Sequence, residues 1–260
     1  METERIAALA AEGKYSFLAF DLVKRISREE CAKYKKEKDR VKAVKKRLHI
    51  LCGAFENDNC HKLAAEILDE IPRGEPMGEE RLKRICLLHA STRERLPVMA
   101  EFYGFLGEAL GSPRRVLDIG CGFAPFCAEL LPSAEEYHAS DIDERSMGLI
   151  SRWFSARGLA GSAAALDAVS RTPDTEGDAA FIFKLYPVLE AQKKGRGFEL
   201  MEELKVEKYA VSFPIRSLGG RDKGMEAFYG EMFEGGLPGC FEITKKKVIG
   251  TELVYAVTRK

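Results

Sequence analysis

The stretch Val116-Leu117-Asp118-Ile119-Gly120-Cys121-Gly122-Phe123-Ala124-Pro125 decides the fold, because it predicts an apolar strand that runs into a glycine-rich turn. Two glycines two positions apart let the backbone turn tightly and approach a ligand without a Cβ clash. A second predicted strand, residues 137–140, ends in Asp141. An acidic residue about 20 positions beyond such glycines binds ribose hydroxyls in nucleotide-binding folds. The sequence therefore predicts a nucleoside cofactor at this turn.

The residues around the turn favour S-adenosylmethionine over a dinucleotide. Pro125 stands where a dinucleotide fingerprint has its third glycine, which argues against a pyrophosphate cradle. Asp118 suits the cationic aminoacyl moiety of S-adenosylmethionine, and Asp167, at the end of a third predicted strand, can accept from the adenine amino group. The alternative is an ordinary strand and turn that bind nothing.

Strands and helices alternate along the second half of the chain. Apolar runs predict strands at residues 116–119, 137–140, 163–166, 179–183 and 209–213, with helices that include 147–156 and 189–204. This alternation is typical of a mostly parallel sheet covered on both faces, an α/β fold. The last two runs, 241–249 and 252–258, predict an antiparallel hairpin at one edge of the sheet.

The first 110 residues are predicted to be helical. Ser27 with Glu30, and Ser91 with Glu94, form capping-box patterns that indicate helix starts. Pro97 must interrupt or restart the helix that follows Ser91. A helix that continues to residue 110 is predicted to stop at Gly111.

The zero net charge of the chain hides a basic segment. Residues 14–47 hold 13 basic and 5 acidic side chains, a net charge of +8, so the remainder carries −8. On a helical wheel, Lys38, Lys42 and Lys45 lie away from an apolar stripe that includes Val44 and Leu48. Like charges on one face repel each other unless an anion is near, which favours a polyanion partner. The alternative is a solvated face.

Composition excludes several other classes of protein. The chain has 260 residues, 45% of them hydrophobic and 32% charged, as in a folded globular protein. No apolar run approaches the roughly 20 residues that cross a membrane, and no signal peptide is visible. The seven cysteines include no Cys-x-x-Cys pair, so neither a metal site nor a disulfide framework is expected. These features predict a reduced, cytoplasmic protein.

Longer motifs identify a family. The chain resembles the 16S rRNA (guanine-1405) N7-methyltransferases that confer aminoglycoside resistance. The resemblance spans nearly the whole chain, and its most specific blocks are residues 89–96 and 212–226. The matching motifs are Arg47-Leu48-His49, Leu88-His89-Ala90-Ser91-Thr92-Arg93-Glu94-Arg95-Leu96, Ile182-Phe183-Lys184-Leu185-Tyr186-Pro187, Ser212-Phe213-Pro214-Ile215-Arg216-Ser217-Leu218-Gly219-Gly220-Arg221, Lys223-Gly224-Met225-Glu226 and Ile249-Gly250-Thr251-Glu252-Leu253.

The resemblance implies a Rossmann-like class I S-adenosylmethionine-dependent methyltransferase core behind a helical N-terminal domain. That domain, residues 1–96, would dock on 16S rRNA in the assembled 30S subunit, and residues 97–260 would form the methyltransferase domain. The family often has alanine where Gly120 stands, which alters the floor of the pocket. The implied S-adenosylmethionine-binding residues are Phe55, His89, Ala90, Ser91, Arg95, Gly120, Asp141, Asp167, Ala168, Phe183 and Gln192.

The expected chemistry needs no catalytic residue that moves a proton. Guanine N7 has a free lone pair and no hydrogen, so it can attack a sulfonium methyl directly once the two are aligned. The target base would be unstacked to reach the methyl. The rRNA-binding residues predicted for this step and for docking are Lys38, Lys42, Lys45, Arg47, Arg216, Ser217, Arg221 and Lys223.

Two other functions compete with this one. The first is a methyltransferase that acts on another rRNA site or on a small molecule, although the basic segment disfavours a small molecule. The second is a non-catalytic RNA-binding protein with an inactive methyltransferase core. Intact Gly120, Gly122, Asp141 and Asp167 argue against an inactive core.

Overall fold

A seven-stranded sheet organises the fold of the chain. The computed structural model describes residues 2–52, 59–215 and 224–260. The strands lie in the order β3-β2-β1-β4-β5-β7-β6. Their bounds are β1 Arg115–Ile119, β2 Glu136–Asp141, β3 Ala160–Ala165, β4 Ala179–Phe183, β5 Lys208–Pro214, β6 Phe241–Ile249 and β7 Glu252–Arg259.

The sheet confirms the predicted α/β class. The first five strands are parallel, and β7 pairs antiparallel with both β5 and β6, so the predicted hairpin closes one edge. β3 begins at Ala160, three residues before the predicted start. The prediction missed this start because the alanine, glycine and serine residues there form no apolar run. The parallel order reverses between β1 and β4, where ligands bind in open sheets of this kind.

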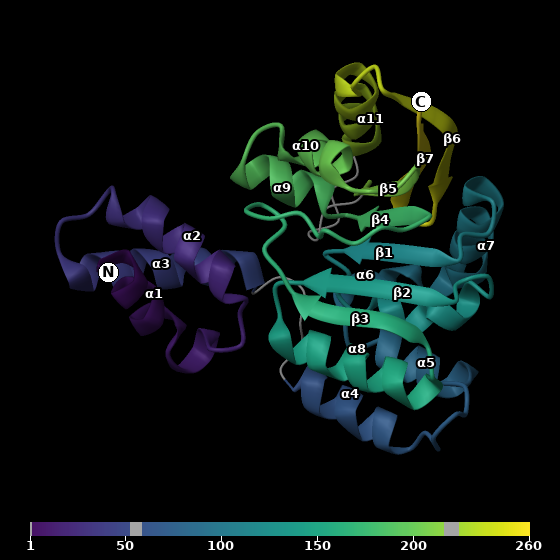
Figure 1. Cartoon of the computed structure of the whole chain (residues 1–260), viewed down its shortest axis with the longest axis horizontal. Helices are drawn as coiled ribbons and strands as arrows, with labels where there is room; N and C mark the ends of the chain where they lie inside the picture. Colours follow the sequence, from purple (N-terminus) through teal and green to yellow (C-terminus); the bar gives the residue numbers. More distant parts are fainter. Residues whose placement is uncertain (1, 53–58, 216–223) are drawn as a thin grey trace.

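Helices cover both faces of the sheet, as Figure 1 shows. The residues of α7 (Met99–Leu110) and α8 (Glu144–Arg157) share one core with the sheet, and α4 (Cys60–Asp69) and α5 (Glu79–Cys86) pack beyond them. The opposite face is covered by α9 (Tyr186–Gln192), α10 (Arg196–Glu203) and α11 (Met225–Gly236). The single helix predicted over 189–204 is therefore two, separated by Gly195 at φ 85°.

The segments that flank the glycine-rich turn and residue 89 differ in detail from prediction. A 3-10 helix, η3 (Ala124–Leu130), follows the turn in place of an α-helix. Helix α6 (Ala90–Arg95) begins one residue before Ser91, so Ser91 does not cap it. A 3-10 turn containing Pro97 then leads into α7, and Gly111, at φ 68°, ends α7 as predicted.

The first three helices form a body with its own core. They are α1 (Glu2–Ala11), α2 (Phe20–Cys31) and α3 (Glu37–Cys52). Ile6, Leu22 and Leu48 are fully buried between them. The helix start predicted at Ser27 is wrong, since Ser27 is buried inside α2, and the basic segment breaks into two helices around residues 32–36. We call residues 2–52 the α1–α3 body.

The α1–α3 body faces the carboxyl ends of the parallel strands (Figure 1). Two backbone hydrogen bonds join it to the segment that leads from β2 into α8: Ala19 donates to the carbonyl of Ile142 at 2.8 Å, and Glu144 donates to the carbonyl of Phe17 at 2.8 Å. Helices α4 and α5 instead share the core of the sheet. The domain boundary expected at residue 96 stays a prediction. It divides the part expected to dock on rRNA from the part expected to transfer the methyl group, and it does not coincide with a boundary between hydrophobic cores.

Candidate functional site

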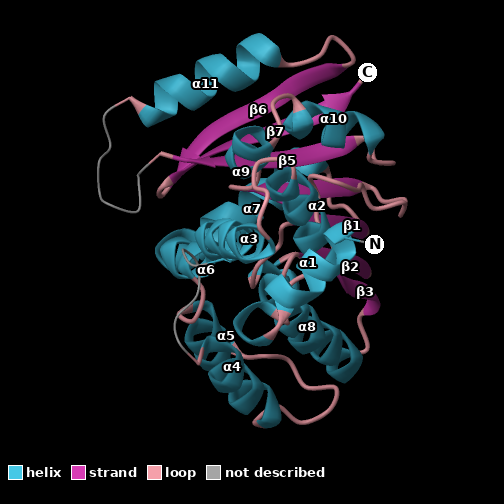
Figure 2. Cartoon of the chain, turned by 90° about the vertical axis from the view of Figure 1, so that its left-hand side faces the viewer, coloured by secondary structure: helices cyan, strands magenta, loops and turns pink. Residues whose placement is uncertain are grey.

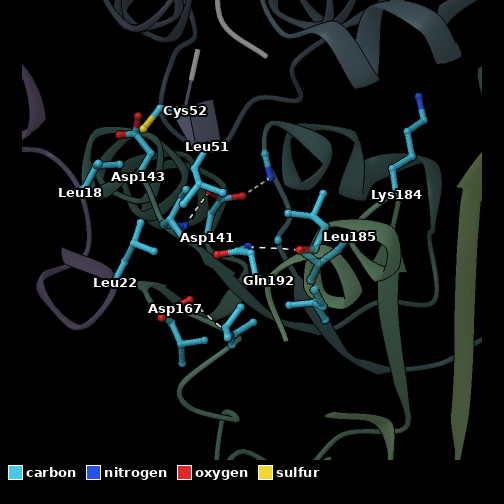
Figure 3. Close-up of a pocket in the computed structure, with 18 of the residues that line it drawn as sticks. Leu18, Leu22, Leu51, Cys52, Asp141, Asp143, Asp167, Lys184, Leu185 and Gln192 are labelled. Atoms are coloured by element: carbon cyan, nitrogen blue, oxygen red, sulfur yellow. Dashed lines mark hydrogen bonds between the residues drawn. The ribbon is translucent and has the colours of Figure 1, made fainter. Parts of the chain in front are cut away.

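A cavity opens where the parallel strands end and the α1–α3 body begins. Figure 3 shows side chains from both parts converging on it. The described residues that line it are Phe17, Leu18, Leu22, Leu51, Cys52, His89, Ser91, Gly120, Gly122, Asp141, Ile142, Asp143, Leu166, Asp167, Ala168, Val169, Phe183, Lys184, Leu185, Val188, Leu189 and Gln192. Apolar walls with a few carboxylates and amides between them are typical of nucleoside sites.

The glycine-rich turn forms the floor of the cavity. Both of its glycines adopt a left-handed backbone conformation. Gly120 has a φ of 64° and Gly122 a φ of 51°. A Cβ on Gly120 would lie 2.8 Å from Leu185 Cδ1, and a Cβ on Gly122 would lie 2.7 Å from His89 Cε1. The backbone conformation favours glycine at both positions, and at Gly122 the His89 ring also lies too close for a Cβ.

His89 covers the turn from the N-terminal side. Its ring stacks on Phe123 with centroids 5.3 Å apart, and Nδ1 lies 3.1 Å from the hydroxyl oxygen of Ser91. Burial, together with the positive charges of Arg95 and Lys184, lowers the pKa of His89 to about 4. His89 is therefore neutral at pH 7 and acts as a flat, uncharged lid.

Asp141 stands at the tip of β2, as predicted. Its Oδ2 accepts from the backbone N–H of Gly122 at 2.8 Å, and its Oδ1 accepts from that of Ile142 at 2.7 Å. Burial raises the pKa of this carboxyl, and the two N–H donors oppose that shift. The carboxylate thus fixes the turn and keeps acceptor sites free for a ligand in the cavity.

Asp118 lies behind the turn and not in the wall of the cavity. Its carboxylate is fully buried, and Oδ2 accepts from the hydroxyl of Tyr137 at 2.7 Å. Oδ1 has no hydrogen-bond partner among the described residues. Burial raises the pKa of Asp118 to about 7. The sequence predicted that Asp118 would contact the aminoacyl moiety of the cofactor. Because Asp118 does not line the cavity, its carboxylate could influence a ligand there only indirectly, through the glycine-rich turn.

Asp167 and Gln192 also line the cavity. Both accept hydrogen bonds from Arg25 of α2. Asp167 also accepts from the backbone N–H of Val169 and from the hydroxyl of Ser170. An arginine from the α1–α3 body therefore holds two polar side chains of the methyltransferase core.

A buried ionic cluster supports the wall near β4. The guanidinium of Arg95 donates to both oxygens of Glu252, at 2.7 and 2.9 Å, and lies 4.6 Å from the ring centroids of both Phe102 and Phe183. Lys184 extends away from the other labelled side chains in Figure 3 and pairs with Glu252 at 3.3 Å. Burial opposes ionisation of Glu252, but the charges of Arg95 and Lys184 outweigh it and lower its pKa.

The structure brings most of the predicted cofactor residues together. His89, Ser91, Gly120, Asp141, Asp167, Ala168, Phe183 and Gln192 all line the cavity. Ala90 and Arg95 do not line it, because Ala90 is buried at the start of α6 and Arg95 is engaged with Glu252. Phe55 lies outside the described residues.

Sequence reasoning missed the contribution of the α1–α3 body. Leu18, Leu22, Leu51 and Cys52 line the cavity from that side. Leu51 continues the apolar stripe of Val44 and Leu48 on the sequence, and no local pattern tells a side chain that faces a cavity from one that fills a core. Figure 3 shows Leu18, Leu22, Leu51 and Cys52 on the side of the cavity opposite Lys184 and Leu185.

The predicted rRNA-binding residues of α3 lie on an accessible face. Lys38 and Lys42 are exposed and Lys45 is half-buried, and none of the three pairs with a carboxylate among the described residues. Arg47 differs, because it donates to both Glu29 and Glu30 of α2. Arg216, Ser217, Arg221 and Lys223 lie outside the described residues and directly follow the end of β5.

The residues that the structure describes offer neither a metal site nor a membrane-spanning helix. They contain no group of three or more histidine, cysteine, aspartate or glutamate side chains placed to hold a metal ion. None of their helices is both long enough and apolar enough to cross a membrane.

Comparison with known proteins gives one consistent match. Residues 12–255 match the family model described as ribosomal RNA methyltransferase (FmrO). A protein from Serratia marcescens named 16S rRNA (guanine(1405)-N(7))-methyltransferase is 40% identical over 256 residues, which covers 98% of each chain.

Solved structures agree with the family match. An rRNA methylase from Escherichia coli superposes with a TM-score of 0.87 at 36% identity, covering 99% of this chain and 100% of the other. The 16S rRNA methyltransferase RmtF, solved in complex with S-adenosyl-L-homocysteine, superposes with a TM-score of 0.88 at 35% identity, covering 100% and 98%. Both likenesses extend through the α1–α3 body, because they span the whole chain.

Proposed function

The chain belongs to the ribosomal RNA methyltransferase (FmrO) family, and from this membership we propose that it transfers a methyl group from S-adenosylmethionine to N7 of guanosine 1405 in 16S rRNA. The observation that carries the proposal is the whole-chain likeness to the Serratia marcescens enzyme, at 40% identity with 98% of both chains covered. Methylation at this position would confer aminoglycoside resistance, as in the family that the chain resembles.

The residues that line the cavity fit S-adenosylmethionine. The apolar side chains of Leu18, Leu166 and Val188 suit an adenine ring, and the carboxylate of Asp141 suits ribose hydroxyls. Gly120 and Gly122 both line the cavity, and without a Cβ they let a ligand approach the backbone. When bound, the cofactor supplies an electrophilic methyl on a sulfonium.

The chain's own residues would act by binding and orientation. Asp141 and the turn would fix one end of the cofactor, and Asp167 with Gln192 would fix the other. Neutral His89 would exclude water from the turn without placing a positive charge beside a sulfonium. Because N7 has no hydrogen to lose, no side chain has to take a proton, and alignment of the two reacting atoms would supply the rate.

We propose that the substrate is the assembled 30S subunit. Lys38, Lys42 and Lys45 would bind rRNA phosphates, and residues 216–223 would receive the target base. Helix α3, which carries these lysines, also contributes Leu51 and Cys52 to the cavity, and Figure 2 views the molecule from the side of the α1–α3 body. A basic face beside the cofactor cavity is what a docked RNA substrate requires. Because 30S subunits are in the cytoplasm, we place the enzyme there.

The test is methylation of purified 30S subunits with the full chain and S-adenosylmethionine. 7-Methylguanosine is cleaved after borohydride and aniline treatment, so primer extension should then stop at nucleotide 1405. Free 16S rRNA, treated in parallel, should give little or no stop. A stop at another nucleotide would favour the alternative of a different rRNA site.

Calorimetry with S-adenosylmethionine distinguishes an active methyltransferase from the remaining alternative, a non-catalytic RNA-binding protein. An enzyme should bind the cofactor saturably. A chain that binds 30S subunits but not the cofactor would instead be an RNA-binding protein with an inactive core. Intact cofactor-site residues on the cavity wall support the enzyme.

A further inference from the structure

Arg25 is one of the residues through which the α1–α3 body contacts the methyltransferase core. It lies in α2, and the side chain is only 12% exposed. Its Nε donates to Asp167 Oδ2 at 2.6 Å, and its Nη2 donates to Asp167 Oδ1 at 3.1 Å. The same Nη2 donates to Gln192 Oε1 at 2.8 Å. One guanidinium thus orients two side chains that end different segments of the core.

The fork geometry explains why this residue is arginine. A planar guanidinium can bind both oxygens of a carboxylate and still donate elsewhere, whereas a lysine ammonium is a point charge on a flexible stem. Asp167 is almost fully buried, so an unpaired carboxylate there would be costly. The pair is therefore built into the wall and is not a surface ion pair.

A second ion pair holds Arg25 itself. Its Nη1 donates to Glu29 Oε1 at 3.1 Å, one helical turn along α2. The other oxygen of Glu29 accepts from Arg47 of α3. A continuous chain of charged groups therefore runs from the cavity wall, through α2, to the helix that carries the basic face.

The neighbours of Arg25 in α2 and the segment before it also line the cavity. Leu18 and Leu22 lie on that wall, whereas Arg25 contacts lining residues without lining it. Moving the α1–α3 body would displace these apolar side chains together with the guanidinium. The fixed position of Asp167 and Gln192 thus depends on a part of the chain expected only to bind rRNA.

We propose that Arg25 is a positioning residue of the cofactor site, which orients Asp167 and Gln192 and holds the α1–α3 body as the apolar wall of the cavity. The proposal rests on S-adenosylmethionine being the ligand of that cavity. It assigns to the α1–α3 body a second role, in cofactor affinity, besides rRNA docking.

The test is calorimetric S-adenosylmethionine affinity of the full chain carrying Arg25→Met or Arg25→Lys. Arg25→Met should bind the cofactor about tenfold or more weakly, because it removes charge-assisted hydrogen bonds from Asp167. Arg25→Lys should recover part of the loss. In methylation assays, the KM for the cofactor should rise while kcat at saturating cofactor changes little.

Arg5→Met is the matched control. Arg5 pairs with Glu37 on an exposed surface within the α1–α3 body, so this variant removes an arginine without touching the cavity. Its cofactor affinity should equal that of the wild type. Thermal unfolding of all variants checks that they are folded, and only folded variants are compared.

A double-mutant cycle with Asp167→Asn makes the test specific. If Arg25 acts through Asp167, the double variant should lose less affinity than the two single losses combined. Additive losses, or affinity equal to the wild type in folded Arg25→Met, would overturn the proposal. Tighter binding by Arg25→Met would also overturn it, since Arg25 would then compete with the adenine for Asp167. No cofactor binding by the wild type would instead remove the proposed function itself.

Discussion

The carboxylate of Asp141 has two tasks at one place, because it accepts from the turn and faces the cavity. Asp141→Ala should weaken S-adenosylmethionine binding by about tenfold or more, since hydrogen bonds to a charged group contribute roughly 1.5–3 kcal/mol. Isothermal calorimetry measures this loss.

Asp178→Ala is the matched control for Asp141. Asp178 also accepts from two backbone N–H groups, those of Arg114 and Arg115, but it lies at the other end of β1. This variant should bind the cofactor as the wild type does. Equal affinities in folded Asp141→Ala and wild type would remove Asp141 from the site.

Asp118 makes the stability of the fold depend on pH. Its pKa is about 7 in the folded protein, against 3.8 for an ordinary aspartate. A pKa raised by folding stabilises the protein below the unfolded-state pKa, and this contribution is lost as the pH rises through the folded-state value. Between pH 5 and pH 8 the wild type should lose on the order of 2 kcal/mol from this group, whereas Asp118→Asn should not.

Urea unfolding at several pH values checks the Asp118 prediction. Tyr137→Phe serves as a second probe, because it removes the hydroxyl that favours the ionised carboxylate. It should move the loss of stability to higher pH. Parallel pH profiles for the wild type and Asp118→Asn would show that the carboxyl titrates normally.

At the scale of elements, the glycine-rich turn and helix α6 are fitted to each other. Gly122→Ala should destabilise the fold by about 1–3 kcal/mol, because alanine is strained at a φ of 51°. Its Cβ would also meet the His89 ring. Adding His89→Ala should restore part of the stability, which chemical unfolding of the three variants measures. If the second substitution only adds its own loss, the ring and the turn do not interact as described.

Helix α3 carries three lysines that form no ion pair with a described carboxylate, whereas the lysines of β6 are paired with glutamates. Replacing Lys38, Lys42 and Lys45 by glutamine should weaken binding to 30S subunits and reduce the slope of log affinity against log salt by about 2, as counterion release predicts. Cofactor affinity should not change. Filter binding over a series of salt concentrations measures both the affinity and its slope.

The lysines of β6 provide a control with the same change in charge. Lys245, Lys246 and Lys247 pair with Glu108, Glu234 and Glu101. Their replacement by glutamine should leave the salt slope of 30S binding unaltered. If both triple variants bind 30S subunits equally well, the basic face of α3 is only solvated.

At the scale of the whole molecule, docking, cofactor binding and base recognition should separate by mutation. Arg216 and Lys223 follow β5 in the sequence, and β5 ends at the edge of the sheet where ligands bind. Arg216→Ala and Lys223→Ala should reduce methylation at nucleotide 1405 and protection against aminoglycosides. They should bind S-adenosylmethionine normally and 30S subunits almost normally. Full methylation by the double variant would remove these residues from the mechanism.

The whole molecule also shows why the N-terminal helices cannot be treated as a separate module. Arg25 and Asp167 are 142 residues apart in the chain, yet they form a bidentate pair in the wall of the cavity. The α1–α3 body has its own core but provides one side of the cofactor site. The body that we propose to dock on rRNA therefore also lines the cavity that we propose for the cofactor.

The sequence by itself determined the class of fold, the turn and the aspartate that line the cavity, and the lysines on an accessible face of α3. These follow from local patterns: apolar runs that alternate with helices, glycines at 120 and 122, an aspartate at the tip of β2, and lysines at helical spacing. Each pattern reports on the conformation of a few neighbouring residues. For that reason the hairpin at the sheet edge and the stop at Gly111 were also predicted correctly.

Only the tertiary structure decided what surrounds the cofactor. Leu51 continues an apolar stripe on the sequence but lines the cavity, and the pairs Arg25–Asp167 and Arg95–Glu252 join residues 142 and 157 positions apart. Asp118 looked like a ligand but is shielded behind the turn, where its pKa rises. The physical reason is that burial and long-range ion pairs depend on which surfaces pack together in the folded chain. A local sequence pattern contains no information about contacts between residues that are far apart in the chain.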